Sequence, residues 1–179
     1  MSPPPPTEPD PAAASPLVWS EDGQPRSSLY GDIYFSTTDG LAESRAVFLQ
    51  GGGLPQAWAD RRRFVVGELG FGTGLNILAL LDLWRRERPS GGRLHIFSIE
   101  AHLMPRAEAA RALAAWPEIA GLSQALLDQW PSPAHGFHRL EFPDLGAVMD
   151  LAVMEVGQAL EEWTGRADAW FLDGFSPAL

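Results

Sequence analysis

The fold is decided by residues 64–76, which read Phe64-Val65-Val66-Gly67-Glu68-Leu69-Gly70-Phe71-Gly72-Thr73-Gly74-Leu75-Asn76. The apolar, β-branched start of this stretch predicts a buried strand. The three alternating glycines predict a tight turn, and the apolar residues with helical spacing from Leu75 onward predict a helix. Strand, glycine turn and helix are typical of the first βα unit of a nucleotide-binding α/β fold, because glycines let a ligand approach the backbone closely.

The spacing of the glycines narrows the choice of ligand. A dinucleotide-binding turn has the pattern G-x-G-x-x-G, but the position of its last glycine is Leu75 here. No Gly-Lys-Ser/Thr follows, so the turn is not a phosphate-binding P-loop. Instead Glu68 precedes the glycines, which suits a ligand without a pyrophosphate whose cation a carboxylate can approach. S-adenosylmethionine, with its sulfonium and ammonium groups, is such a ligand; a glycine turn that binds nothing is the alternative.

Acidic residues also follow the other predicted strands. Glu100 closes the strand at 94–99, Glu155 follows the strand at 147–153, and Asp173 follows the strand at 169–172. Parallel strands bring their carboxyl ends to one edge of a sheet, where open α/β folds bind ligands. At the end of the second strand, Glu100 can accept hydrogen bonds from ribose hydroxyls. A solvated loop carboxylate is the alternative at each position.

Asp173 stands beside residues that suit a particular chemistry. It is followed by Gly174, Phe175 and Pro177. A carboxylate can orient an amine and accept a proton from it, while an aromatic ring holds a flat base or excludes water. This combination favours transfer of a methyl group to an amine, with a plain Asp-Gly turn as the alternative.

Composition limits the other classes of function. The 179 residues suit one domain, 45% are hydrophobic, cysteine is absent and the net charge is −10. An acidic chain is a poor non-specific binder of nucleic acid, so an RNA partner needs a local basic patch. The arginine run at 61–63 could contact phosphate or simply be solvated. No signal pattern or long apolar run is present, so we expect a cytoplasmic protein without a membrane span. The histidines lack ligand spacing, so we expect no metal.

The remaining segments complete an α/β plan. Residues 1–16 are rich in Pro and Ala and are expected to form a disordered tail, with one domain over 17–179. A strand at 17–19 that runs into an Asp-Gly turn predicts a hairpin-like extension, and a second extended piece is expected at 33–36. Helices are expected at 40–49, 106–116, 120–130 and 157–163. The strands at 137–142 and 147–153 are expected to pair in part with each other.

Four motifs in this order resemble the methyltransferase domain of the MnmC family of tRNA 5-methylaminomethyl-2-thiouridine biosynthesis proteins. They lie at residues 32–36, 40–49, 67–76 and 170–178, and the resemblance runs from about Leu17 to the end of the chain. It implies a Rossmann-like α/β fold of the class I S-adenosylmethionine-dependent methyltransferases. It also implies methylation of the aminomethyl nitrogen of 5-aminomethyl-2-thiouridine at the tRNA wobble position.

The resemblance implies a role for each matching position. The glycine loop and the acid before it would line the methionine part of the cofactor, and Glu100 would hold the ribose. Asp173 would be the catalytic residue that faces the substrate amine. Where the family usually has Gly-Asp, this chain has Met154-Glu155, a departure on the adenine side. The cofactor-binding residues would be Glu68, Gly70, Phe71, Gly72, Gly74, Asn76, Glu100 and Glu155, and the substrate-binding residues Tyr34, Phe175 and Pro177.

The resemblance also sets expectations about partners. Family members continue with further strands, and many carry an FAD-dependent oxidase domain, so FAD would belong to a domain outside this chain. We therefore expect a truncated chain with a partial sheet, whose unpaired edge could support a dimer, besides tRNA and an oxidase domain or protein as partners. Three alternatives remain: a methyltransferase of this fold that acts on another amine, an inactive fragment that binds S-adenosylmethionine, and a nicotinamide-dependent dehydrogenase, against which Leu75 argues.

Overall fold

The computed structural model describes residues 17–19, 25–27 and 40–173. The expected tail at 1–16 lies outside the described residues, as does the extended piece at 33–36. The same holds for Tyr34, Phe175 and Pro177, so their expected roles stay predictions.

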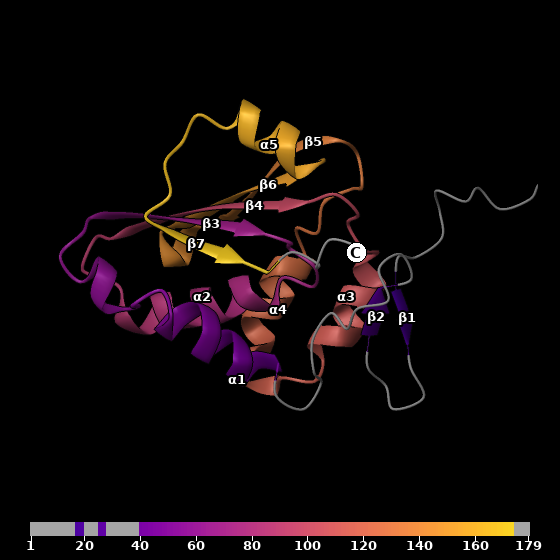
Figure 1. Cartoon of the computed structure of the whole chain (residues 1–179). Helices are drawn as coiled ribbons and strands as arrows, with labels where there is room; N and C mark the ends of the chain where they lie inside the picture. Colours follow the sequence, from indigo (N-terminus) through magenta and orange to yellow (C-terminus); the bar gives the residue numbers. More distant parts are fainter. Residues whose placement is uncertain (1–16, 20–24, 28–39, 174–179) are drawn as a thin grey trace, which may run out of the picture.

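The centre of the molecule is a five-stranded sheet with the order β5-β6-β4-β3-β7 (Figure 1). Strands β6, β4, β3 and β7 are parallel, and β5 is antiparallel to β6. The inner strand β3 is buried along most of its length, as expected for a parallel strand with neighbours on both sides. The expected α/β fold is therefore confirmed. The strands are β3 (Arg63–Leu69), β4 (Arg93–Glu100), β5 (Gly136–Phe142), β6 (Ala147–Val153) and β7 (Ala169–Leu172).

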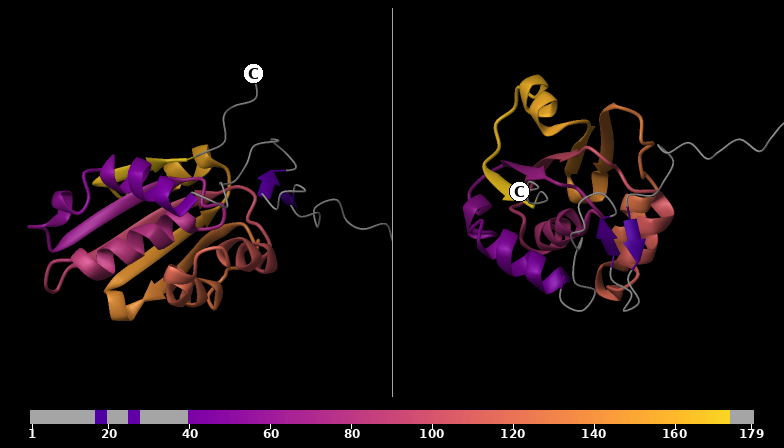
Figure 2. Two further views of the ribbon diagram at one scale, coloured as in Figure 1. Left: turned by 90° about the horizontal axis from the view of Figure 1, so that it is seen from below. Right: turned by 45° about the vertical axis from the view of Figure 1, so that its right-hand side comes forward.

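Helices cover the two faces of the sheet unequally. Helices α1 to α4 lie on one face, whereas α5 alone lies on the other (Figures 1 and 2). The main core lies between the sheet and the larger helical layer. The α-helices are α1 (Gly40–Ser44), α2 (Leu75–Glu87), α3 (Arg106–Leu113), α4 (Ala120–Leu127) and α5 (Val156–Glu162). The shorter or π-helical turns are η2 (Arg45–Gln50), η3 (Gln56–Trp58), η4 (Pro117–Ile119) and η5 (Pro143–Leu145).

Tryptophans anchor the main core. The rings of Trp58 and Trp84 meet edge to face with centroids 5.0 Å apart, and Phe64 of β3 packs on Trp58 at 5.6 Å. Each indole N–H donates to a backbone carbonyl, Trp58 to Glu87 and Trp84 to Leu145. The rings are therefore buried without an unsatisfied donor, which stabilises the layer under the sheet.

Several boundaries differ from the expected ones. Helix α3 ends at Leu113 rather than at 116; Trp116 precedes Pro117 and takes a non-helical conformation, with φ −122° and ψ 85°. Helix α4 ends at Leu127, and three-residue turns replace its expected last turn. The expected helix at 40–49 is α-helical only to Ser44 and then continues as the π-helix η2. Strands β5 and β6 pair along their whole length, not in part.

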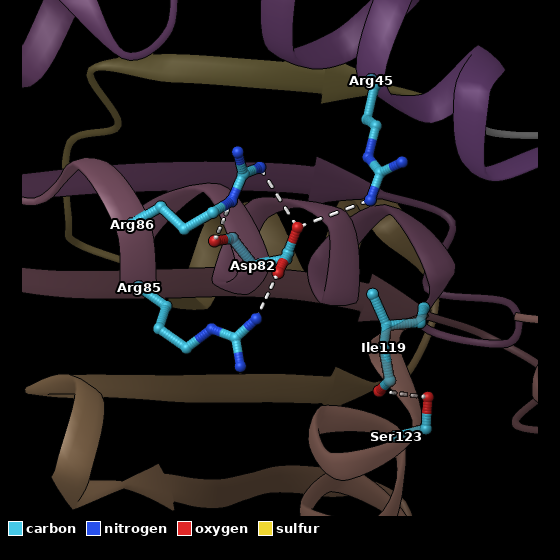
Figure 3. A network of polar contacts seen from close by, with 6 residues as sticks. All are labelled: Arg45, Asp82, Arg85, Arg86, Ile119 and Ser123. Carbon is cyan, nitrogen blue, oxygen red and sulfur yellow. Dashed lines mark hydrogen bonds and ion pairs between the residues drawn. The ribbon is translucent and has the colours of Figure 1, made fainter. Parts of the chain in front are cut away.

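The first helical segment is fastened to α2 by one carboxylate. Asp82 of α2 is buried and accepts from Arg45 of η2 at 3.4 Å (Figure 3). Its two oxygens also accept from Arg85 at 2.8 Å and Arg86 at 3.1 Å. This ion-pair cluster fixes η2, and with it the adjoining α1, against the helix that follows the glycine turn.

One expectation about the periphery of the molecule is confirmed. Strands β1 (Leu17–Trp19) and β2 (Pro25–Ser27) form an antiparallel pair, which confirms the hairpin-like extension. In the described part of the chain β7 pairs only with β3, and its Leu172 is 70% exposed. The dimer and the domain boundary at residue 17 stay predictions. No helix in the described ranges is both long and apolar enough to cross a membrane.

Candidate functional site

The carboxyl ends of three adjacent strands bring three of the expected acids together. Glu68 lies near the end of β3, Glu100 ends β4, and Asp173 directly follows β7. Strand β3 lies between β4 and β7, so Glu68 occupies the middle of this edge. Burial is the main cause of the raised pKa of Glu68, and the charges of Asp173 and Glu100 raise it further. The three carboxylates therefore form one electrostatic unit.

The glycine turn lies over this edge. Gly70, Gly72 and Gly74 have φ values of +87°, +54° and +79°, which favour glycine over residues with a Cβ. Gly70 N donates to the carbonyl of Ile99 at 3.0 Å, which ties the turn to β4. Its backbone can thus pass close to a ligand.

Glu100 holds the turn from the side of β4. Its Oε2 accepts from the amide of Gly72 at 2.9 Å, and its Oε1 accepts from the amide of His102 at 2.9 Å. A carboxylate has about four acceptor sites, so both oxygens can still accept from ribose hydroxyls. Glu100 is therefore suited both to shape the turn and to contact a ribose.

Glu68 is the most perturbed ionisable group of the site. Its side chain is fully buried, and Ser98 Oγ, from the paired position on β4, donates to its Oε2 at 2.5 Å. Within the described ranges, Oε1 is buried and no hydrogen bond reaches it, although the nearby Asn76 amide acts to lower the pKa of Glu68. Burial, more than any other cause, raises the pKa of Glu68 to about 8. A buried carboxylate oxygen without a donor fits the ammonium group of S-adenosylmethionine, which would supply that donor.

A hydrogen-bonded chain holds Asp173. Ser44 Oγ donates to Asn76 Oδ1 at 2.6 Å, and Asn76 Nδ2 donates to Asp173 Oδ2 at 2.7 Å. Asp173 is exposed as a residue, but this carboxyl oxygen meets the buried Asn76. Desolvation raises the pKa of Asp173, the Asn76 hydrogen bond lowers it, and the charge of Glu43 raises it. The net upward shift suits a group that must accept a proton.

Two of the expected cofactor-binding residues, Phe71 and Glu155, do not present their side chains beside the other site residues as expected. The Phe71 side chain is buried against Trp130, with ring centroids 5.4 Å apart, so only its backbone remains for a ligand. Glu155 is exposed and precedes α5. No hydrogen bond or ion pair joins Glu155 to the other acids in the described part of the chain. Its expected adenine-side role stays a prediction.

Sequence reasoning missed two residues of the site. Ser44 and Ser98 each donate to an expected site residue, but single serines carry no motif. The strand pairing that sets Glu68 beside Ser98 was the one available signal, and it requires the register to be known. Within the residues described, no group of three or more His, Cys, Asp or Glu side chains is arranged to hold a metal ion.

Relatives of known name match nearly the whole chain. The chain is 70% identical over 169 residues to the tRNA 5-methylaminomethyl-2-thiouridine biosynthesis bifunctional protein MnmC of Caulobacter vibrioides, covering 94% of this chain and 29% of that protein. It is 55% identical to the protein of the same name from Maricaulis maris, covering 90% of this chain and 28% of that protein. The chain thus spans less than a third of the length of these relatives.

A family model and a solved structure agree with these matches. Residues 117–179 match the model described as S-adenosyl-L-methionine-dependent methyltransferase. The crystal structure of MnmC2 from Aquifex aeolicus superposes with a TM-score of 0.65 at 23% identity, covering 92% of this chain and 50% of that one. This likeness shows the fold. Over the part that it shares with these relatives, the chain is similar to the MnmC family.

Proposed function

We propose that this chain is an S-adenosylmethionine-dependent methyltransferase that methylates the aminomethyl nitrogen of 5-aminomethyl-2-thiouridine at the tRNA wobble position, giving 5-methylaminomethyl-2-thiouridine. The observation that carries the proposal is the group of Glu68, Glu100 and Asp173 around a glycine turn. The names of the MnmC relatives and the methyltransferase family model support the same activity.

Different residues of the chain would bind the cofactor and act on the substrate. When bound, S-adenosylmethionine supplies a methyl group on a positively charged sulfur. Glu68 would bind the ammonium of the cofactor through its unpartnered Oε1, and Glu100 would accept from the ribose. The turn at Gly70, Gly72 and Gly74 would bring its backbone against the methionine part.

Asp173 would act on the substrate. Its Oδ2 is held by Asn76, which leaves Oδ1 to accept a hydrogen bond from the amine. Bound S-adenosylmethionine would supply the methyl group to the nitrogen lone pair, and Asp173 would accept the proton that the nitrogen loses. We propose that Tyr34, Phe175 and Pro177 close the pocket around the base and that Glu155 lies on the adenine side.

The proposal extends to partners and location. A tRNA substrate implies work in the cytoplasm. The relatives are named bifunctional, and we propose that an FAD-dependent oxidase domain or protein supplies the free aminomethyl group. Pairing of two copies through the open edge of β7 is the matching proposal for a dimer.

A titration and a transfer assay test the function. We expect saturable S-adenosylmethionine binding by calorimetry, weakened about tenfold or more in Glu100→Ala, since a hydrogen bond to a charged group contributes about 1.5–3 kcal/mol. Asp173→Asn should bind the cofactor like the wild type but lose on the order of 100-fold or more in methyl transfer to under-modified tRNA. Cofactor binding without transfer to that tRNA, but with transfer to another amine, would support the alternative methyltransferase. No cofactor binding by the folded chain would contradict the proposal.

A further inference from the structure

The opposite edge of the sheet has a different electrostatic character. The amino-terminal ends of β3 and β4 lie there, and α2, which runs back between them, ends nearby. Within residues 61–93 this arrangement gathers a group of arginines on a chain whose net charge is −10. They are Arg61, Arg62, Arg63, Arg85, Arg86, Arg88 and Arg93.

Some of these arginines are already neutralised and others are not. Arg61 pairs with Asp168 at 2.5 Å, and Arg85 and Arg86 pair with Asp82. In the described part of the chain, Arg62, Arg63, Arg88 and Arg93 have no carboxylate within ion-pair distance. These exposed guanidinium groups retain their full charge toward solvent.

Two of the unpaired arginines line a hollow. It has a volume of about 400 Å³, and its lining includes Arg63, Arg93, Arg139 and Glu141. A Cβ built on the lining residue Gly146 would lie 3.4 Å from Arg93 Nη1 and 3.6 Å from Arg88 Nη1. Guanidinium groups from separate segments therefore converge on one concave surface.

Two lining residues of the hollow, Arg139 and His95, belong to an ion-pair network around Asp150. Arg139 of β5 donates to both oxygens of Asp150 on β6, at 2.7 and 2.9 Å, and His95 Nε2 lies 2.7 Å from Asp150 Oδ2. Asp150 thus offsets Arg139, whereas no ion pair offsets Arg63 or Arg93 in the described part of the chain. The carboxylate of Glu141 also lines the hollow, so the summed formal charge of the hollow stays positive but is reduced. Helix α5 packs on the other half of this face, where Phe97 and Trp163 stack, so the hollow stays open.

We propose that this hollow binds the phosphate backbone of the RNA substrate, with Arg63 and Arg93 as its main contacts; the inference rests on the proposed function. Guanidinium groups bind phosphates through paired N–H donors, and an acidic protein needs such a local patch to hold a polyanion. Neither residue belongs to the site at the carboxyl edge. The hollow is therefore a second, non-catalytic contact with the RNA.

The size of the sheet sets the distance between the two contacts. Strand β3 has 7 residues and at roughly 3.3 Å per residue spans roughly 23 Å. An RNA backbone that contacts both the site and the hollow must span roughly this length, which is more than the single nucleotide that carries the modified base. The hollow would therefore hold the stem beside the loop that presents the modified base.

The test measures binding of a fluorescently labelled, unmodified tRNA transcript across a series of salt concentrations. Arg63→Ala/Arg93→Ala should weaken affinity about tenfold at moderate salt and reduce the slope of log affinity against log salt by about two, one for each lost phosphate contact. Arg63→Lys/Arg93→Lys should keep most of the slope, because the charges remain. Arg111→Ala, an exposed arginine on α3, should behave like the wild type.

Unchanged affinity and slope in the double alanine variant would overturn the proposal, as would a wild-type chain that binds no tRNA at low salt. Calorimetry with S-adenosylmethionine on the same variants separates the two proposals. If the arginine variants lose RNA binding while the wild type transfers no methyl group, the hollow stands and the proposed function fails. If methyl transfer occurs and the double alanine variant has the same KM for tRNA as the wild type, the proposed function is supported and the proposed RNA contact at the hollow is wrong.

Discussion

Asn76 Nδ2 donates a hydrogen bond of 2.7 Å to Asp173 Oδ2, which joins the first turn of α2 to the residue that follows β7. The amide of Asn76 is oriented by Ser44 Oγ, which donates to its Oδ1 at 2.6 Å. Because the serine occupies the carbonyl oxygen, the NH2 group faces the carboxylate. Ser44 is thus a positioning residue for Asp173, although it lies on α1.

Removing this donor should raise the pKa of Asp173. The Asn76 hydrogen bond lowers that pKa against the upward effect of desolvation, so Asn76→Ala leaves the upward effects unopposed. Ser44→Ala should shift the pKa in the same direction by less, since the amide remains. Carboxyl-carbon NMR titration of the chain measures both shifts. An Asp173 pKa that is unchanged in Asn76→Ala would contradict the role of the hydrogen bond.

Glu68 should make the stability of the free chain depend on pH. Its pKa is raised from 4.5 to about 8 in the folded chain, so folding favours its protonated form. This contribution to stability is fully present below pH 4.5 and is lost as the pH rises through about 8. Urea unfolding should therefore show a free energy of unfolding that falls from pH 5 to pH 9, by an amount on the order of a few kcal/mol.

Glu68→Gln is the matched control, because the amide has the size of the carboxyl and stays neutral. Its stability should vary much less over the same range and should exceed that of the wild type at pH 9. A wild type and a Glu68→Gln variant with parallel pH profiles would show that Glu68 ionises normally in the folded chain.

Cofactor binding should release a proton near neutral pH. An ammonium group that meets Glu68 Oε1 favours the charged carboxylate and lowers its raised pKa. Calorimetric titrations with S-adenosylmethionine at pH 7, in buffers of different ionisation enthalpy, give the number of protons exchanged. We expect release of up to about one proton in the wild type and much less in Glu68→Gln. Equal exchange in the two proteins would mean that the ammonium does not contact Glu68.

The sequence predicted the elements whose signals are local. The apolar run at 64–66, the alternating glycines and the helix from Leu75 are strong local patterns, and the structure confirms each of them. The grouping of Glu68, Glu100 and Asp173 followed from one topological rule, that parallel strands end on the same edge.

Other features depend on contacts between distant segments. Ser98 meets Glu68 only because β3 and β4 pair in one register, and Ser44 meets Asn76 because α1 packs against α2. The hollow between Arg63 and Arg93 likewise requires that α2 bring the two strands into parallel pairing. These contacts join residues that are far apart in the sequence. The periodicity of a short segment does not report such contacts, so local patterns could not predict them.

Gly67→Ala should destabilise the chain. A Cβ at this position would lie 2.5 Å from the ring of Trp170, the residue paired with Gly67 on β7. The indole already packs against Trp163 and must move, so we expect a loss of about 1–3 kcal/mol in the free energy of unfolding. Gly157→Ala on α5 is the control, because its Cβ meets nothing within 4 Å and alanine favours the helix. Equal urea midpoints for the two variants would show that the Trp170 ring can move aside without a loss in the free energy of unfolding.

Asp82→Asn should loosen the segment that positions the site. The carboxylate is 8% exposed and pairs with Arg45, Arg85 and Arg86, whose side chains are 37–52% exposed and hence partly screened. We expect a loss of about 1–3 kcal/mol in the free energy of unfolding, the range for a hydrogen-bonded charge with one buried partner. Because Arg45 adjoins Ser44, the variant should also raise the pKa of Asp173, as Ser44→Ala does. Asp144→Asn, which changes an exposed carboxylate, should alter neither quantity. A destabilised Asp82→Asn with an unchanged Asp173 pKa would show that α1 holds Ser44 in place without the ion-pair cluster.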